Sequence, residues 1–261
     1  MKIGIIGYGV VGIAVETTLI DKYEIIKYDK FKKHDEFSSL SECDFVFITV
    51  PTPFTSKKKG FDDSFVIESL QRLEDIGFSN IVIIKSTLIP GSCIKYDDMF
   101  KLKIVHNPEF LRESTTPNED FRNQMFVVIG TSNSEVFNSI KLMYQKVLIN
   151  ECKYYHTSNI EAEMIKSAQN TILASRVALS NVIYDACNKY KIDYDKVRKI
   201  AFDDCSLIGP NMVQVPGPDG KRGFGGKCLP KDILAFSRLY KSEIINEIIA
   251  YNWSLRDDLD E

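Results

Sequence analysis

Short, continuous runs of apolar residues recur along the first half of the chain. They are Lys2–Ile6, Glu24–Tyr28, Phe45–Val50, Ile81–Lys85, Lys103–His106 and Met125–Gly130. Strands that are covered on both faces by crossover helices are apolar at every position rather than at alternate positions. The runs therefore predict an α/β fold built on a doubly wound, parallel Rossmann sheet.

Between these runs, apolar residues recur at intervals of three and four, which predicts amphipathic crossover helices over Val10–Ile20, Asp62–Ile76 and Ser134–Val147. From about Ser158 only the helical pattern remains. It predicts a long helix over Ile160–Tyr190 and shorter helices near Tyr194–Phe202, Leu229–Leu239 and Lys241–Trp253. We expect a Rossmann domain at 1–157 and a smaller, all-helical domain at 158–261.

The composition adds constraints on partners and location. With 44% hydrophobic and 26% charged residues, the chain is typical of globular proteins. Its formal net charge of -3 provides no positive field for a polyanion, so we expect no nucleic-acid partner. The six cysteines have no paired spacing, which argues against a metal site and favours reduced thiols. No apolar run is long enough for a membrane span or a signal peptide, so we expect a cytoplasmic protein without a membrane partner.

A glycine-rich loop follows the first predicted strand and opens the first predicted helix. Its G-x-G-x-x-G spacing, at Gly7, Gly9 and Gly12, lets backbone amides approach a pyrophosphate at the helix N-terminus. Asp29 ends the second strand, where a carboxylate accepts ribose hydroxyls and repels a 2′-phosphate. These features favour NAD over NADP, although Lys30 and Lys33 weaken that exclusion. The alternative is a glycine-rich turn in a fold that binds no nucleotide.

Polar loops follow the next three strands, at Val50–Pro53, Ser86–Gly91 and Asn107–Glu113. Each alone reads as an ordinary turn. Because ligands of such sheets bind beyond the carboxyl ends of the strands, their joint placement favours contacts to the cofactor. The run Lys57–Lys59 is more typical of a solvated loop than of a phosphate contact.

Cys228 follows two glycines and stands near a predicted helix start, within Gly225–Asp232. Exposed amides and nearby lysines favour a thiolate there, so a nucleophile and a buried structural cysteine remain about equally supported. We interpret the other five cysteines as structural. Asp232 lies one helical turn after Cys228. Lys166 and Asn170, four residues apart, could together hold an oxyanion, but a solvent-facing helix surface is the simpler interpretation.

In this order, the motifs resemble the nucleotide-sugar 6-dehydrogenases. The resemblance runs from the glycine loop through the three strand-end loops and the pair Lys166 and Asn170 to Gly225–Asp232, and Val215–Gly220 strengthens it. It covers essentially the whole chain. It implies a four-electron oxidation of the C6 alcohol of a sugar, with UDP-glucose as the expected substrate, UDP-glucuronate as the product and NAD as the acceptor.

The resemblance also implies a role for each matching residue. Cys228 would capture the aldehyde as a thiohemiacetal and carry the thioester. Lys166 and Asn170 would stabilise negative charge, Asp232 would transfer protons with a water near Thr87, Glu109 would assist hydrolysis, and Glu113 would support the site. The implied cofactor contacts are Gly7, Gly9, Val10, Val11, Gly12, Asp29, Lys30, Pro51, Thr52, Ser86, Thr87 and Glu113. The implied substrate contacts are Phe110, Leu111, Lys166, Asn170, Phe224 and Gly225.

The chain departs from the family pattern at two places. It ends inside an expected long helix, so we expect the C-terminal UDP-binding domain to be absent. Leu207–Gly209 stands where other members have Arg-Ile-Gly, and Lys221 or Arg222 could replace the missing charge.

Two alternatives stay open for the function. One is a partial subunit that binds NAD and needs a separate chain. The other is a short dehydrogenase of the 3-hydroxyisobutyrate type, although a single hydride transfer needs no thiol. A homodimer is expected, because Ile244, Ile245, Ile248, Ile249 and Trp253 would otherwise expose an apolar stripe.

Overall fold

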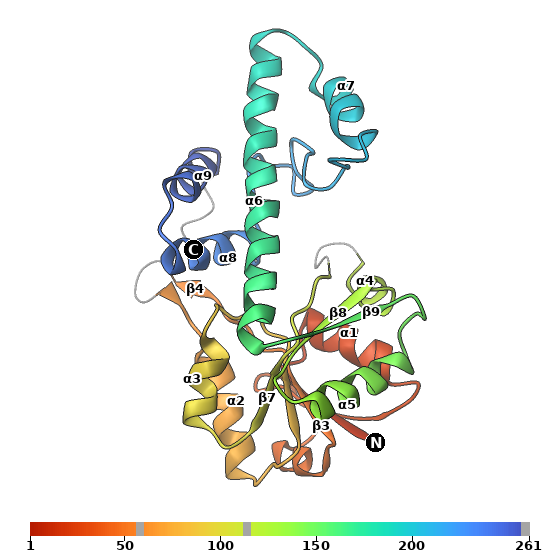
Figure 1. Cartoon of the computed structure of the whole chain (residues 1–261). Coiled ribbons are helices and arrows are strands. Elements are labelled where there is room, and N and C mark those ends of the chain that lie inside the picture. Colours follow the sequence, from red (N-terminus) through yellow and green to blue (C-terminus); the bar gives the residue numbers. More distant parts are fainter. Residues whose placement is uncertain (56–59, 112–115, 257–261) are drawn as a thin grey trace. The chain divides into compact units, whose positions relative to one another are not determined.

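The structure is a computed structural model that describes residues 1–55, 60–111 and 116–256 (Figure 1). Close contacts divide the chain into two units, Met1–Lys166 and Ser167–Glu261. The division falls inside one long helix.

The first unit is built on a seven-stranded sheet, counted over the described residues, in the order β2-β1-β3-β6-β7-β8-β9. The strands are β1 (Lys2–Ile6), β2 (Glu24–Tyr28), β3 (Phe45–Ile48), β6 (Ile81–Ile84), β7 (Lys103–His106), β8 (Phe126–Gly130) and β9 (Lys153–Thr157). Neighbouring strands are parallel except β7 and β8, which meet antiparallel at His106 and Gly130. The predicted doubly wound sheet is confirmed, with this one reversal.

The connection before β8 carries α4 (Pro117–Arg122), a helix of six residues. After this connection, β8 pairs antiparallel with β7 on one side and parallel with β9 on the other.

Helices cover both faces of the sheet (Figure 1). The helices α1 (Val10–Leu19) and α5 (Ser134–Gln145) lie on one face, and α2 (Ser64–Asp75) and α3 (Ser92–Met99) lie on the other. Alternate residues of one strand enter opposite clusters: Phe45 and Phe47 pack with Tyr144, whereas Val46 and Ile48 pack with Leu70. Burial on both sides explains why the strands are apolar at every position. A 3₁₀ helix, η1 (Phe37–Glu42), and a short hairpin, β4 (Phe54–Thr55) with β5 (Gly60–Phe61), complete the unit.

The second unit is helical, as predicted. The long helix α6 (Asn159–Lys189) continues into it and is followed by α7 (Tyr194–Arg198), the π-helical turn η2 (Lys199–Asp203), α8 (Leu229–Leu239) and α9 (Glu243–Ser254). Its core joins three helices and the loop before α8, through Ala174, Ala178, Phe224, Ile233 and Ile249.

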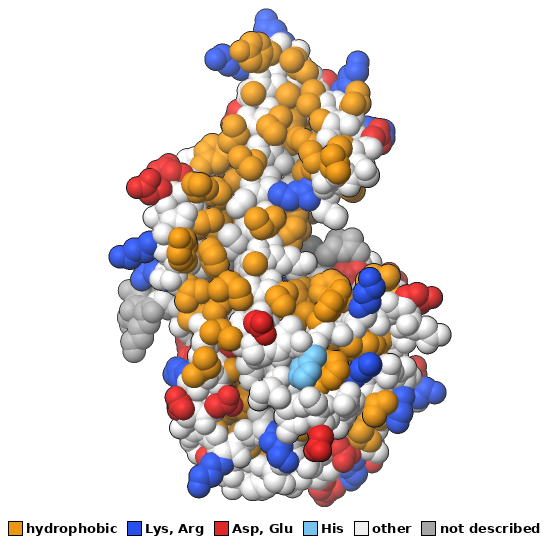
Figure 2. All heavy atoms as spheres, viewed as in Figure 1, with side chains coloured by type: hydrophobic (Ala, Val, Ile, Leu, Met, Phe, Trp, Pro, Cys, Tyr) orange, Lys and Arg blue, Asp and Glu red, His pale blue; other side chains and the backbone are white. Residues whose placement is uncertain are grey.

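The apolar residues of α6 and α9 divide between core and surface. On α6, Ile172, Leu179 and Val182 are 62%, 58% and 48% exposed, and Figure 2 shows hydrophobic side chains along this helix. On α9 the expected exposed stripe is wrong in part. Ile249 is buried, and Ile245 and Ile248 pack against the same core, whereas Ile244 and Trp253 are exposed.

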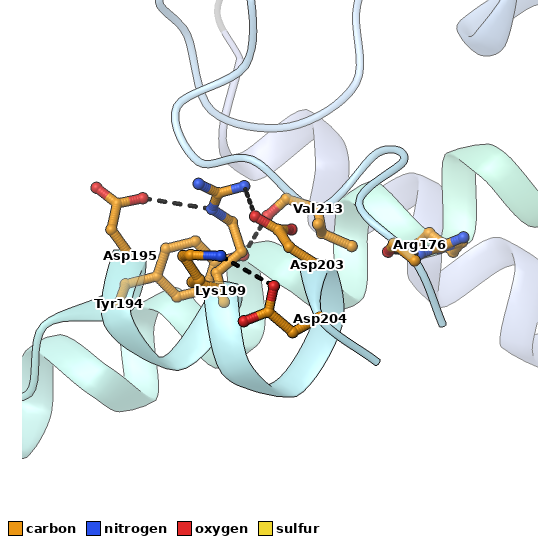
Figure 3. Close-up of polar contacts among 9 residues, drawn as sticks. Arg176, Tyr194, Asp195, Lys199, Asp203, Asp204 and Val213 are labelled. Atoms are coloured by element: carbon orange, nitrogen blue, oxygen red, sulfur yellow. Dashed lines mark hydrogen bonds and ion pairs between the residues drawn. The ribbon is translucent and has the colours of Figure 1, made fainter. Parts of the chain in front are cut away.

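Polar contacts anchor the segment between η2 and α8 (Figure 3). The Tyr194 hydroxyl donates to the Val213 carbonyl, and Arg176 on α6 donates to the Gly209 carbonyl (3.0 Å). Arg198 pairs with Asp203 at 2.8 Å. Within the described residues, no helix is long and apolar enough to cross a bilayer.

Candidate functional site

The glycine loop follows β1, the strand at which the order of strands in the sheet reverses. The next strand along the chain, β2, lies on one side of β1, and β3 lies on the other side. Gly7 has φ +90°, which favours glycine. A Cβ on Gly12 would clash with the Gly7 carbonyl oxygen, whereas a Cβ on Gly9 would meet no atom within 4 Å. The loop is therefore packed tightly at both ends and open in the middle.

This open middle is the start of α1. Gly9 caps the helix without a side chain, and the first turn, beginning at Val10 and Val11, has no acidic residue. The positive end of the helix dipole is thus left for an anion. The loop fits the pyrophosphate of a dinucleotide.

Asp29 follows β2 and binds the glycine loop. Its carboxylate accepts the N–H of Tyr8 at 2.7 Å and the N–H of Phe31 at 2.9 Å. Burial raises the pKa of Asp29, but these hydrogen bonds outweigh it and hold the pKa below its usual range. The carboxylate is ionised and suited to ribose hydroxyls. Lys30 binds both carboxylate oxygens of Glu68 on α2, at 2.8 Å each.

Two hydroxyl groups join the loops after β3 and β6. Thr52 donates to the Thr87 carbonyl (2.9 Å), and Ser86 donates to the Val50 carbonyl (2.7 Å). Thr52 and Ser86 are buried, Thr87 is half-buried, and Pro51 is exposed. The structure thus brings these predicted cofactor contacts together at one edge of the sheet.

Glu109 and Lys166 form a buried ion pair. The Lys166 ammonium lies 3.6 Å from Glu109 Oε1 and 5.3 Å from the ring centre of Phe110, and Leu111 N–H donates to Glu109 Oε2 at 2.7 Å. Lys166 is only 5% exposed, so the simpler interpretation of a solvated helix surface is wrong for it. The pair combines a carboxylate and a cation in one place.

The predictions for Glu113 and for the run Lys57–Lys59 concern residues outside the described part of the chain.

Lys85, which the sequence did not single out, lies beneath the same loops. Its ammonium donates to the backbone oxygen and to Oδ1 of Asn107, both at 3.1 Å. Tyr144 donates to the same Oδ1 at 2.6 Å. The residue joins the starts of the two loops that carry Thr87 and Glu109. A lysine that ends an otherwise apolar strand was the available signal.

Glu163 on α6 was also missed. Its fully buried carboxylate accepts the N–H of Gly91 at 2.7 Å and the N–H of Cys93 at 2.8 Å. It thereby caps α3, whose own N-cap, Gly91, has no side chain to do so. The cap fixes the end of the Ser86–Gly91 loop.

In the second unit, Asn170 donates to a carboxylate oxygen of Asp232, and the Lys231 ammonium lies 3.1 Å from the other oxygen. Asn170 and Asp232 are 5% and 4% exposed. A solvent-facing position is therefore wrong for Asn170 as well. The amide holds a buried carboxylate in a defined orientation.

Cys228 is the N-cap residue of α8 and is half-buried. The loop before it is clamped by α9: Asn252 accepts the N–H of Phe224 (2.7 Å) and donates to its carbonyl (3.0 Å). A Cβ on Gly225 would overlap the guanidinium of Arg256, which pairs with Asp219 at 2.7 Å. The thiol thus follows a loop whose backbone is fixed from the end of the second unit.

The other cysteines largely match the structural interpretation. Four are buried, and Cys205 is half-buried because it lies in the loop after η2. Leu207, in the segment that departs from the family pattern, is exposed. Arg222, one of the two residues that could replace the missing charge, pairs with Asp185 at 2.6 Å.

Comparison with known families matches most of the chain. The sequence profile of the NAD binding domain of the UDP-glucose/GDP-mannose dehydrogenase family matches residues 22–148, and that of the central domain of the same family matches residues 160–253. UDP-glucose 6-dehydrogenase of Rickettsia bellii is 34% identical over 243 residues, which cover 89% of this chain and 54% of the relative. The chain spans about half the length of the curated relatives that it matches.

Solved structures share the fold. A UDP-glucose dehydrogenase from Pyrobaculum islandicum matches 97% of this chain and 68% of its own, with a TM-score of 0.82 and 22% identity. The 3-hydroxyisobutyrate dehydrogenase of Mycobacterium tuberculosis matches 99% of this chain and 95% of its own, with a TM-score of 0.73 and 13% identity. At these identities the likeness concerns the fold alone.

Proposed function

Since the chain belongs to the UDP-glucose/GDP-mannose dehydrogenase family, we propose that it oxidises the C6 alcohol of UDP-glucose to the carboxylate of UDP-glucuronate. One observation carries this proposal. Asp232, buried and held by Asn170, lies one helical turn after Cys228 at the start of α8. A thiol and an oriented carboxylate serve covalent capture of an aldehyde, which a single hydride transfer does not require.

The first unit contains the NAD-binding domain of the family. Gly7, Gly9 and Gly12 would hold the pyrophosphate and Asp29 the ribose. When bound, NAD supplies the acceptor for two successive hydrides. The open start of α1 and the ionised Asp29 support this assignment.

The thiol of Cys228 acts between the two oxidations. Its thiolate adds to the C6 aldehyde and forms a thiohemiacetal, which keeps the aldehyde bound. Loss of a hydride and a proton gives a thioester, and water then cleaves the C–S bond to release the acid and restore the thiol.

The buried polar residues supply charge and proton transfer. Lys166 and Asn170 stabilise negative charge at the C6 oxygen, because a cation and an amide donor in a dry environment interact strongly with an oxyanion. Asp232 takes up the alcohol proton with a water near Thr87, and Glu109 activates the water that cleaves the thioester. Their burial supports these roles.

A second candidate is a subunit that binds NAD and needs a separate chain for the sugar nucleotide, because the family match lies in the NAD-binding and central domains. The short 3-hydroxy-acid dehydrogenase shares the fold and length, but the family match weighs against it.

Incubation of the purified chain with NAD and UDP-glucose separates these candidates. The proposed reaction yields two NADH per acid formed. NADH formation only after addition of a separate C-terminal domain would support the partial subunit. Turnover of small hydroxy acids alone would contradict both.

Cys228→Ser tests the covalent step. We expect acid formation to fall by at least about a thousand-fold, because serine lacks an equivalent thiolate. The matched control is Cys205→Ser in the same unit, which should retain activity. Full acid formation by Cys228→Ser would show that the mechanism is wrong.

A homodimer and a cytoplasmic location complete the proposal. The exposed apolar residues of α6 support the dimer, because an unpartnered stripe of this kind is unfavourable in water. The six cysteines without paired spacing support this location, because they favour reduced thiols.

A further inference from the structure

In the glycine loop, the backbone of Tyr8 binds both a carboxylate and an ammonium group. The N–H of Tyr8 donates to Asp29 Oδ2 at 2.7 Å, and the carbonyl of Tyr8 accepts from Lys32 Nζ at 2.6 Å. Both groups bind the backbone of the same residue, and the positive charge of Lys32 lies close enough to Asp29 to help lower the pKa of its carboxyl group. The ammonium is anchored at the edge of the dinucleotide site.

The neighbouring lysines are placed differently. Lys30 binds both oxygens of Glu68 at 2.8 Å, so its charge is compensated at α2. Lys33 is exposed. The sequence drew attention to Lys30 and Lys33, but Lys32 is the lysine that the structure brings to Asp29.

This position matters because of the one chemical difference between NAD and NADP. In this fold, the acidic residue after the second strand binds the ribose hydroxyls, and NADP carries a phosphate on the 2′ hydroxyl. A carboxylate repels that phosphate, whereas an ammonium group beside it attracts the phosphate.

We propose that Lys32 sets how strictly this site discriminates between the two cofactors: its ammonium offsets part of the repulsion between Asp29 and a 2′-phosphate, so NADP binds as a second, weaker ligand. The inference rests on the dinucleotide-binding part of the proposed function and is independent of sugar oxidation.

Binding of NADH and NADPH, followed by nicotinamide fluorescence on the full chain, tests the inference without turnover. We expect the wild type to bind both, with NADH bound more tightly. Lys32→Gln should weaken NADPH binding about five-fold and change NADH binding less than about two-fold, as for an exposed ion pair. Lys32→Arg keeps the charge and should retain NADPH binding. Lys33→Gln, the matched control, should leave both affinities unchanged.

Several results would overturn the inference. They are an absence of NADPH binding to the wild type, an equal loss of both dinucleotides in Lys32→Gln, and the same loss in Lys33→Gln. Retained NADH binding shows that a variant is folded. If the wild type binds both dinucleotides as expected but oxidises no sugar, the catalytic proposal fails and the role of Lys32 stands.

Discussion

Lys85 is a lysine whose ammonium group has almost no contact with water, since the residue is 2% exposed. Burial lowers its pKa to about 7, although the charge of Glu109 opposes this shift, and Lys166 adds to it. The two oxygens of Asn107 that it binds, and the ring of Phe121 at 4.9 Å, partly replace the lost hydration. Lys85 is thus held in a buried position where the loops after β6 and β7 begin.

This burial predicts a pH dependence of stability. An unfolded lysine has a pKa near 10.5, so between about pH 7 and about pH 10 the unfolded chain binds more protons at Lys85 than the folded chain. The free energy of unfolding should therefore rise with pH across this range. Lys85→Met should reduce that slope by up to about 1.4 kcal/mol per pH unit.

Urea unfolding at several pH values measures the slope. Lys101→Met, an exposed lysine of the same unit, is the control and should leave the slope unchanged. An identical slope in wild type and Lys85→Met would contradict the assignment of a buried, neutral lysine above pH 7.

At the residue scale, the sequence predicts a residue's role where the local backbone conformation alone requires that residue type. Gly7 and Gly12 are recognisable because a positive φ and a close backbone approach admit no side chain. Lys85 is not recognisable in the same way. A charged residue after four apolar ones reads as the exposed end of a strand, and only the packing of Asn107 and Tyr144 over it shows otherwise.

At the scale of elements, the N-terminus of α3 depends on a carboxylate from another helix. Glu163→Gln keeps the size of the side chain but replaces one acceptor oxygen by a donor, which faces the N–H groups of Gly91 and Cys93. We expect the first unit to lose about 1–2 kcal/mol of unfolding free energy. Hydrogen exchange at the amides of Gly91 and Cys93 should also accelerate.

Denaturant unfolding and amide exchange measured by NMR check this cap. Glu151→Gln, which removes an exposed carboxylate of the same unit, should change neither. Unchanged exchange at Gly91 and Cys93 in Glu163→Gln would disprove the proposed cap.

The loop before Cys228 depends in the same way on α9. Asn252→Ala would leave the buried N–H and carbonyl of Phe224 without their partner, which costs about 1–3 kcal/mol. We expect faster exchange of the Phe224 amide and easier proteolysis of the loop. Asn246→Ala, on an exposed position of the same helix, is the control. Equal proteolysis of both variants would argue against the clamp.

Elements with a local sequence pattern were predictable. The helix α8 was predicted over Leu229–Leu239 and is found over the same residues, because helical periodicity is a local pattern. The strand β9 was missed, since it lies at the edge of the sheet and its residues, Lys153–Thr157, are mostly polar or aromatic. The contacts of Glu163 and Asn252 join residues far apart in sequence, and no local pattern reports them.

At the scale of the whole molecule, the exposed face of α6 predicts self-association. Ile172, Leu179 and Val182 lie on one side of the helix, and a dimer would bury them. Leu179→Lys should shift the protein toward the monomer by at least about ten-fold in dissociation constant, because a charge would enter an apolar contact.

Sedimentation at several concentrations measures this shift. Asn188→Lys, near the end of the same helix and on the opposite side, should leave the association unchanged. A monomeric wild type would contradict the dimer.

The fold class followed from the sequence, since buried strands and crossover helices leave different periodicities. Whether an apolar stripe on a helix is buried or exposed did not follow from the sequence. The same spacing of isoleucine and leucine occurs on α6, where the residues are exposed, and on α9, where Ile249 is buried. Only the arrangement of neighbouring helices decides whether a stripe forms a core.

The contact between Asn252 and the loop before Cys228 also has a consequence for the order in which the protein folds during synthesis. Domains generally acquire structure from the N-terminus as the chain leaves the ribosome. Met1–Lys166 is a unit by its own contacts, whereas the backbone of Phe224 is held by a residue 28 positions later in the chain. The nascent protein should therefore have a formed dinucleotide-binding unit well before the loop that leads to Cys228 is fixed in place.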